Sequence, residues 1–118
     1  MRISIEMVAM KDFFGRAPYN RRKGGLIMKY FAVLLPMRNA DKSRDFRPQH
    51  LAFLEKMRNS GHVAANGKFA DGSGGLVIYK APSFEACEAL VITDPYIVEG
   101  ARRYEIFEWE AVWAEEAP

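Results

Sequence analysis

The sequence has little of what marks several large protein classes. It has one cysteine in 118 residues, so an internal disulfide is excluded. No apolar run reaches the roughly 18 residues of a membrane-spanning helix, and no secretory signal pattern opens the chain. These absences favour a cytoplasmic location and no membrane partner. The lone Cys87 lies among apolar residues at helical spacing, which is typical of a buried core thiol more often than of a nucleophile.

Signatures of metal and nucleotide cofactors are also missing. Two histidines and one cysteine at unrelated spacings do not form a metal-ligand pattern. The glycine-rich segment 72–75 leads into an apolar strand pattern, and no Lys-Ser or Lys-Thr pair follows it. A phosphate-binding loop would instead open a helix. We therefore expect neither a metal nor a cofactor.

An excess of charge of one sign is confined to the start of the chain. Residues 1–27 carry six Lys or Arg against two acidic residues, whereas the remainder carries eleven basic and thirteen acidic residues. The formal net charge of +2 therefore belongs to the N-terminal segment. Because the larger part has no basic stripe interleaved with aromatic residues, nucleic acid is not an expected partner.

The length and composition predict one globular domain, since 118 residues with 49% hydrophobic content can bury one core. Residues 1–27 contain three glycines and a proline and keep no period, so we expect a poorly ordered extension before a domain at 28–118. Two interpretations of the extension stay open. It is either a translated upstream region, with a ribosome-binding site encoded before Met28, or a flexible basic arm.

From Met28 onward, apolar periodicity and turn residues predict six elements. In chain order they are a strand at 29–35, a helix from about 43 to 60, strands at 63–69 and 76–79, a helix at 83–93 and a strand at 104–113. Residues 38–42 are expected to form a loop. Pro48 lies within the first turns of the first helix, so regular helix is expected only from about Arg47.

The element order β-α-β-β-α-β is that of a ferredoxin-like α+β fold, with a four-stranded antiparallel sheet and two helices on one face. Its first and third strands are central, and here these are the two strands that are apolar on both faces. Two helices cover only one face, which leaves apolar side chains of the central strands on the other. A homodimer packed sheet to sheet would bury them.

Two short motifs far apart in the chain contain the candidate catalytic residues His50 and Asp94. Arg47 precedes His50 by one helical turn, and Asp94 opens an Asp-Pro-Tyr motif that ends at Tyr96. Histidine has an ordinary pKa of about 6.5, and a carboxylate against one ring nitrogen leaves the other free to move protons. From the residues alone, alternatives remain open. His50 could instead donate to a carbonyl at a helix edge, and Asp94 could cap the segment that follows it.

These motifs together resemble the YciI family, also called YCII-related domain proteins. The resemblance covers nearly all of residues 28–118 and rests on the opening Met-Lys-Tyr-Phe-Ala-Val at 28–33, Arg-x-x-His-Leu at 47–51, Gly67, and Asp-Pro-Tyr at 94–96 followed by Gly100. It implies a dimeric α+β barrel in which His50 and Asp94 form a hydrogen-bonded pair in a cleft of each subunit. It also implies lyase or isomerase chemistry on small cyclic or aromatic metabolites.

The resemblance also indicates where this sequence departs from the family. Gly-Pro after the second strand is Gly67-Lys68 here, which places a long cation in the expected pocket wall. A serine seen before the third strand of some relatives corresponds to Gly75. Ser73, two residues earlier, is the substitute that we consider for substrate binding.

The expected function is a cofactor-independent lyase or isomerase in which Asp94 orients His50 and His50 moves a proton of a small-molecule ligand. Arg47 could bind a substrate carboxylate or phenolate, and Tyr96 could donate its hydroxyl or only pack. Two alternatives to catalysis remain. One is a ligand-binding or regulatory dimer, and the other is a scaffold in which His50 and Asp94 contribute only stability.

Overall fold

The computed structural model describes residues 27–115, so the expected extension, apart from Ile27, lies outside the described residues. The order of the main elements confirms the prediction, with two short helices, α2 and α5, added to it. The elements are β1 (Lys29–Pro36), α2 (Ala40–Asp45), α3 (Arg47–Asn59), β2 (Val63–Lys68), β3 (Gly74–Ala81), α4 (Phe84–Val91), α5 (Pro95–Val98) and β4 (Glu105–Trp109).

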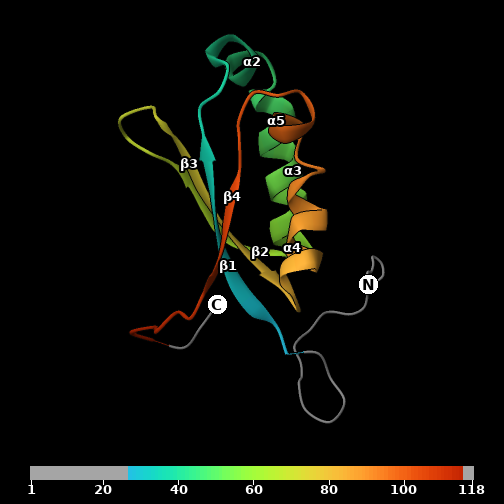
Figure 1. Cartoon of the computed structure of the whole chain (residues 1–118), viewed down its shortest axis with the longest axis vertical. Helices are drawn as coiled ribbons and strands as arrows, with labels where there is room; N and C mark the ends of the chain where they lie inside the picture. Colours follow the sequence, from blue (N-terminus) through green and yellow to red (C-terminus); the bar gives the residue numbers. More distant parts are fainter. Residues whose placement is uncertain (1–26, 116–118) are drawn as a thin grey trace.

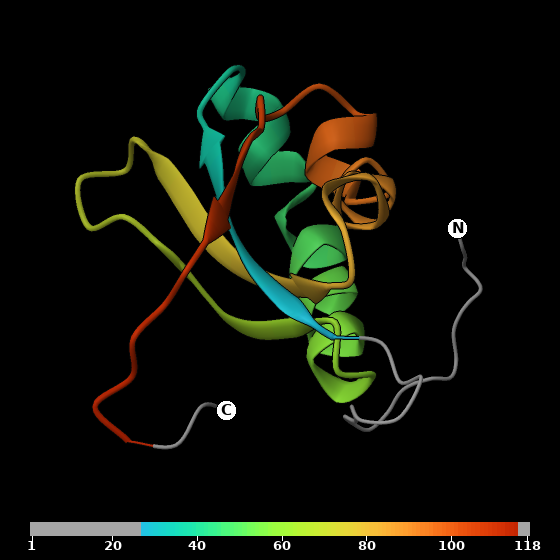
Figure 2. The same cartoon turned by 60° about the horizontal axis from the view of Figure 1, so that its bottom comes forward.

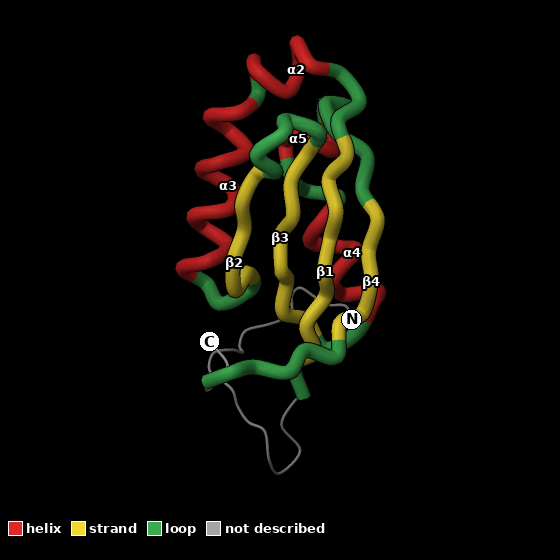
Figure 3. Tube along the Cα trace, turned by 90° about the vertical axis from the view of Figure 1, so that its left-hand side faces the viewer, coloured by secondary structure: helices red, strands yellow, loops and turns green. Residues whose placement is uncertain are grey.

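The four strands form one antiparallel sheet in the order β2-β3-β1-β4 (Figure 3). The central pair is β1 and β3, the two strands whose sequences are apolar on both faces, as predicted. In their register Phe31 lies opposite Tyr79 and Val33 opposite Val77. This is the sheet of a ferredoxin-like α+β fold.

The region between β1 and α3 differs from the prediction. Residues 38–42 were expected to be a loop, but the side chain of Asn39 accepts a hydrogen bond from the Lys42 amide and caps α2. The helix ends at Asp45, and α3 begins at Arg47 with Pro48 in its first turn. Because Pro48 has no N–H for the helical ladder, one continuous helix would lose a hydrogen bond there. The predicted start of regular helix near Arg47 is confirmed.

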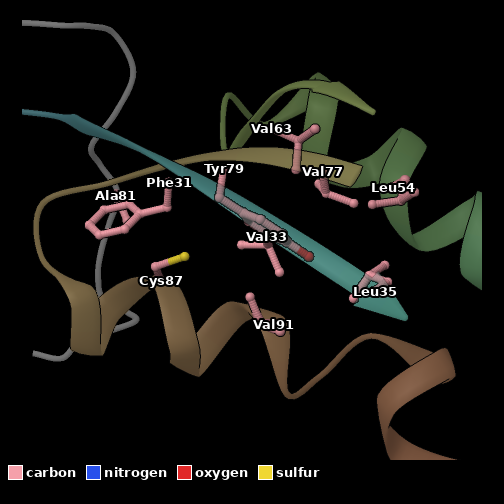
Figure 4. Close-up of a cluster of buried hydrophobic side chains, with 10 residues drawn as sticks. All are labelled: Phe31, Val33, Leu35, Leu54, Val63, Val77, Tyr79, Ala81, Cys87 and Val91. Atoms are coloured by element: carbon pink, nitrogen blue, oxygen red, sulfur yellow. The ribbon is translucent and has the colours of Figure 1, made fainter. Parts of the chain in front are cut away.

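The helices α3, α4 and α5 lie on one side of the sheet, and α2 lies beyond the end of β1 (Figures 1 and 2). Between α3, α4 and the sheet is the core shown in Figure 4. It comprises Phe31, Val33, Leu35, Leu54, Val63, Val77, Tyr79, Ala81, Cys87 and Val91. The predicted core position of Cys87 is confirmed, and burial raises the pKa of its thiol. Among the described helices, none has the length and apolar character needed to cross a membrane.

The other face of the sheet, which we call the open face, is not covered by any helix or strand of residues 27–115 (Figure 3). The strand register brings apolar side chains together on it: Ala32, Leu34, Leu76, Ile78, Phe107 and Trp109. Phe107 is 53% exposed and Trp109 is 42% exposed. β4 ends at Trp109 rather than at 113 because its partner there, Tyr30, is one residue from the start of β1.

Candidate functional site

His50 and Asp94 meet inside the molecule as the sequence motifs predicted. His50 lies in the first turns of α3 and Asp94 directly before α5, and Figure 1 shows these helices side by side. The ring nitrogen Nδ1 of His50 lies 2.9 Å from Oδ1 and 3.0 Å from Oδ2 of Asp94. Both residues are buried, His50 at 7% exposure and Asp94 at 0%.

This contact fixes the roles of the two ring nitrogens of His50. An ionised carboxylate can only accept hydrogen bonds, so Nδ1 carries the proton and the neutral ring has its lone pair on Nε2. Nε2 makes no hydrogen bond within residues 27–115, yet it is not among the unpaired polar atoms that are fully buried there. His50 also lines a cavity. The ring therefore offers a basic nitrogen to that cavity.

Asp94 combines the two roles that the sequence left open. Its Oδ1 accepts a hydrogen bond from the Tyr96 amide at 2.9 Å, which caps α5, while both carboxylate oxygens face His50. The charge of the carboxylate is thus held at the start of a short helix by a backbone donor. This arrangement fixes Asp94 in position and suits it to balance a positive charge on the imidazole.

Tyr96 packs against the histidine and also reaches the cavity. Its ring stacks on the His50 imidazole with centroids 3.8 Å apart and planes 12° apart. The residue is 3% exposed, but its hydroxyl has no hydrogen bond within the described chain and is not fully buried. The structure therefore shows the packing role of Tyr96 against His50 and leaves its hydroxyl available to a ligand.

The cavity lies between the end of the sheet and the helices α2, α3 and α5, and its volume is about 520 Å³. This volume is within the range of small-molecule sites, about 300 to 1,000 Å³. Two glycines of β3 shape its wall. A Cβ on Gly74 would lie 2.5 Å from the Leu35 carbonyl oxygen, and one on Gly75 would lie 3.0 Å from that of Gly67. The strand can approach its neighbours this closely only without side chains there.

The other residues proposed from the sequence differ in position. Arg47 lines the cavity from the start of α3, and Lys68 lines it from the end of β2. Ser73 does not: it is exposed in the hairpin loop, while Gly72 and Gly74 on either side line the cavity. Its amide donates to Asp71 at 2.9 Å, which holds it in that turn. No contact in the structure supports the substrate-binding role that was expected for Ser73.

Sequence reasoning missed Arg102, which also lines the cavity. Its Nε and Nη2 donate to the Ser43 hydroxyl at 3.2 and 2.8 Å, and Nη1 donates to the Leu35 carbonyl at 3.2 Å. Its guanidinium carbon lies 4.6 Å from the centroid of the Tyr96 ring. In the sequence, Arg102 and Arg103 look like an ordinary pair of solvated charges, and only the fold separates their environments.

The arrangement can bind and deprotonate a small molecule. It has a cavity open to solvent, a histidine nitrogen with a free lone pair, a carboxylate behind that histidine, and arginines in the wall. Within residues 27–115, no three His, Cys, Asp or Glu side chains lie close enough together to hold a metal ion.

The fold is shared with a dehydrochlorinase of known structure. The chain resembles the 5-chloro-2-hydroxyhydroquinone dehydrochlorinase of Burkholderia phenoliruptrix AC1100, in complex with 2,5-dihydroxybenzoquinone, with a TM-score of 0.60 and 20% identity. The alignment covers 69% of this chain and 93% of that one. No curated protein matches the chain. A model of the YCII-related domain matches residues 28–110, and the chain therefore belongs to the YCII-related domain family.

Proposed function

We propose that this protein is an enzyme of lyase or isomerase type that moves a proton of a small metabolite through His50 and Asp94. The observation that carries the proposal is the pairing of Nδ1 with a buried carboxylate while Nε2 remains open to the cavity. A dehydrochlorinase with the same fold, seen with a quinone ligand, supports a cyclic or aromatic substrate. No step of this chemistry requires a cofactor.

In the proposed mechanism, Nε2 of His50 removes a proton from a carbon or hydroxyl of the substrate. The imidazole becomes positively charged, and the carboxylate of Asp94 stabilises that charge at 2.9 Å. In an elimination, the electron pair left on the substrate expels a leaving group from the neighbouring carbon. In an isomerisation, His50 returns the proton to a different atom. Tyr96 and Arg47, which line the same cavity, would position the substrate.

The experiment compares turnover of wild-type protein and variants on a panel of lactones and halogenated phenols. Acid-base catalysis by a positioned side chain contributes about 100 to 10,000-fold to rate. His50→Ala is expected to lose that factor on any substrate that the wild type converts. His62→Ala is the matched control, since His62 is the other histidine and does not line the cavity.

Full turnover by His50→Ala would contradict the proposal. Binding of panel compounds by the wild type with no product formed from any of them would favour the other candidate, a non-catalytic ligand-binding module.

We also propose that the protein is a homodimer joined through the open face. Exposed Phe107 and Trp109 extend the apolar surface of the central strands to the edge of the sheet. Large contiguous apolar patches are rare on monomers, and pairing two identical faces around a two-fold axis would bury both. The cavity lies on the opposite side of the sheet, among the helices, so this pairing leaves it open to ligand.

A further inference from the structure

We propose that the cavity is built for a small carboxylic acid whose carboxylate binds between Arg102 and Arg47. The inference rests on the proposed function in one respect, because it places the rest of the acid beside the proton-transfer nitrogen of His50. It adds the class of substrate and a binding residue, Arg102, that the sequence motifs do not contain.

The first observation is the charge of the cavity wall. Four cationic side chains line it, those of Arg44, Arg47, Lys68 and Arg102. Of the described residues that line it, none is acidic. The nearby Asp94 is 0% exposed, is engaged by His50 and does not line the cavity, although its charge acts on Arg102 from behind the wall. An anion entering this cavity meets attraction from several sides and no facing carboxylate.

The second observation is that Arg102 makes no direct ion pair. Its three hydrogen bonds go to a hydroxyl and a carbonyl, both neutral, and it forms no ion pair within residues 27–115. Partial burial is the main cause of its lowered guanidinium pKa. Tyr96 and the Asp94 charge act in the opposite direction, and the nearby charge of Arg47 lowers the pKa further. Partly buried charges are normally paired. The protein has therefore placed a cation where a bound anion would stabilise it.

Arg47 is free to share the anion with Arg102. It is exposed at the start of α3 and makes no ion pair within the described chain, whereas Arg44 is engaged by Asp41 and Asp45. Its effect on Arg102 shows that the two charges lie within electrostatic range of each other. Two like charges in the same wall repel each other, and an anion bound between them would remove that repulsion.

The third observation is the hydrogen-bonding capacity left on Arg102. A guanidinium has five N–H donors, and three are used. Because Nε and Nη2 share the Ser43 hydroxyl, one N–H on Nη1 and one on Nη2 remain. Two donors on neighbouring nitrogens match the two oxygens of a carboxylate. Ser43 and the Leu35 carbonyl hold the group rigidly, so little side-chain entropy is lost when an anion binds.

The apolar residues that line the cavity indicate what the non-carboxylate part of the acid is. Leu51, Leu54 and Val77 supply apolar surface in the same cavity. A volume of about 520 Å³ accommodates one ring with small substituents. The expected ligand is therefore a small aromatic or alicyclic carboxylate, with its ring against the leucines and its charge at the arginines.

The test compares two probes of the same shape, benzoate and the neutral benzamide. Binding is followed by chemical-shift changes of backbone amides around the cavity, in titrations up to millimolar concentration. Benzoate is expected to shift them and benzamide is not. Arg102→Gln should weaken benzoate binding about tenfold or more, because a hydrogen bond to a charged group contributes about 1.5 to 3 kcal/mol.

Arg103→Gln is the matched control: it removes the same charge one residue away, from an exposed side chain that lies 3.9 Å from Glu105 and outside the cavity. It should bind benzoate like the wild type. Arg47→Gln provides a second variant in case Arg102→Gln fails to fold, since Arg47 makes no structural hydrogen bond within the described residues.

Equal binding of benzoate and benzamide, no benzoate binding by the wild type, or unchanged benzoate binding by both folded arginine variants would overturn the inference. These outcomes are independent of turnover. Benzoate binding is measured without any reaction, so the loss of acid selectivity in the arginine variants and the loss of turnover in His50→Ala are separate failures that separate measurements detect.

Discussion

Two buried polar side chains, Asp94 and Tyr79, differ in whether they are hydrogen-bonded. Asp94 is satisfied by His50 and by the Tyr96 amide. The hydroxyl of Tyr79, on the helix side of β3, is buried and has no hydrogen-bond partner within the described residues. Burial is the main cause of its raised pKa, and the charge of Asp94 and the nearby Cys87 add to it. A buried hydroxyl without a partner lowers stability.

Replacing Tyr79 with phenylalanine should therefore raise the free energy of unfolding, by about 1 kcal/mol, since the aromatic packing stays and an unsatisfied group is removed. Chemical denaturation of the variant measures this. Tyr104→Phe is the matched control, because the Tyr104 hydroxyl donates to Glu88 at 2.8 Å, and its loss should lower stability instead. A less stable Tyr79→Phe protein would show that the hydroxyl is in fact bonded.

At the scale of elements, the side chain of Asp94 positions both the start of α5 and the ring of His50. Asp94 caps this four-residue helix and orients His50, so the helix start and the histidine are held together. The Asp-Pro pair made the cap predictable, because proline is favoured in the first turn and aspartate directly before it.

The capping role can be separated from the histidine contact with two substitutions. Asp94→Ala and Asp94→Ser both lose the bond to His50, but the serine hydroxyl can still accept from the Tyr96 amide. Asp94→Ala should be the less stable of the two by about 1 kcal/mol, the usual effect of losing a cap. Thermal and denaturant unfolding measure the difference. Equal stabilities would mean that the cap contributes nothing.

Local rules predicted α3, α4 and the strand order, but not α2 or the wall of the cavity. α3 and α4 have an apolar period and a proline or serine at the start, which are local signals. α2 is six residues long and depends on its Asn39 cap. Arg102 reaches the site because Arg102 and Ser43, 59 positions apart, meet near the end of β1. No pattern in a single sequence encodes that meeting.

At the scale of the whole molecule, the open face defines the proposed dimer. Phe107→Asp should give a monomer that stays folded, because the side chain is 53% exposed and a charge there opposes sheet-to-sheet packing. Sedimentation of the wild type should give the dimer mass. Phe84→Asp is the control, since Phe84 is comparably exposed at the start of α4, away from the open face. A monomeric wild type would contradict the proposal.

Stability should also fall at alkaline pH through Cys87. Its thiol pKa is raised by burial in the folded state, so above the ordinary value of about 8.5 the unfolded chain loses a proton that the folded chain keeps. Stability is unaffected by this group below that pH and decreases above it by up to about 1.4 kcal/mol per pH unit.

Denaturation between pH 7.5 and about 9.5, below the ordinary tyrosine pKa of about 10, measures this slope. Cys87→Ala should be less stable throughout, because it leaves a small void, but its stability should depend less on pH. Identical slopes for the two proteins would show that the thiol is not protected.

The fold was more accessible to sequence reasoning than the site was. Apolar strands, caps and turns have local sequence signals that recur along the chain. The cavity instead depends on close approaches between strands where glycines carry no side chain. Gly75 lines the cavity, whereas Ser73, the residue expected from the sequence to bind substrate, does not. The His50 and Asp94 pair was found because two motifs pointed to it.

The most direct measurement of the central claim is the tautomer of His50, read from the ¹⁵N signals of its ring nitrogens when the imidazole is neutral. The pairing with Asp94 predicts a proton on Nδ1 and a bare Nε2 that responds when a ligand enters the cavity. Asp94→Asn should weaken that preference, because the amide can donate to Nδ1. A wild-type protein with its proton on Nε2 would have no base facing the cavity and would contradict proton transfer by His50.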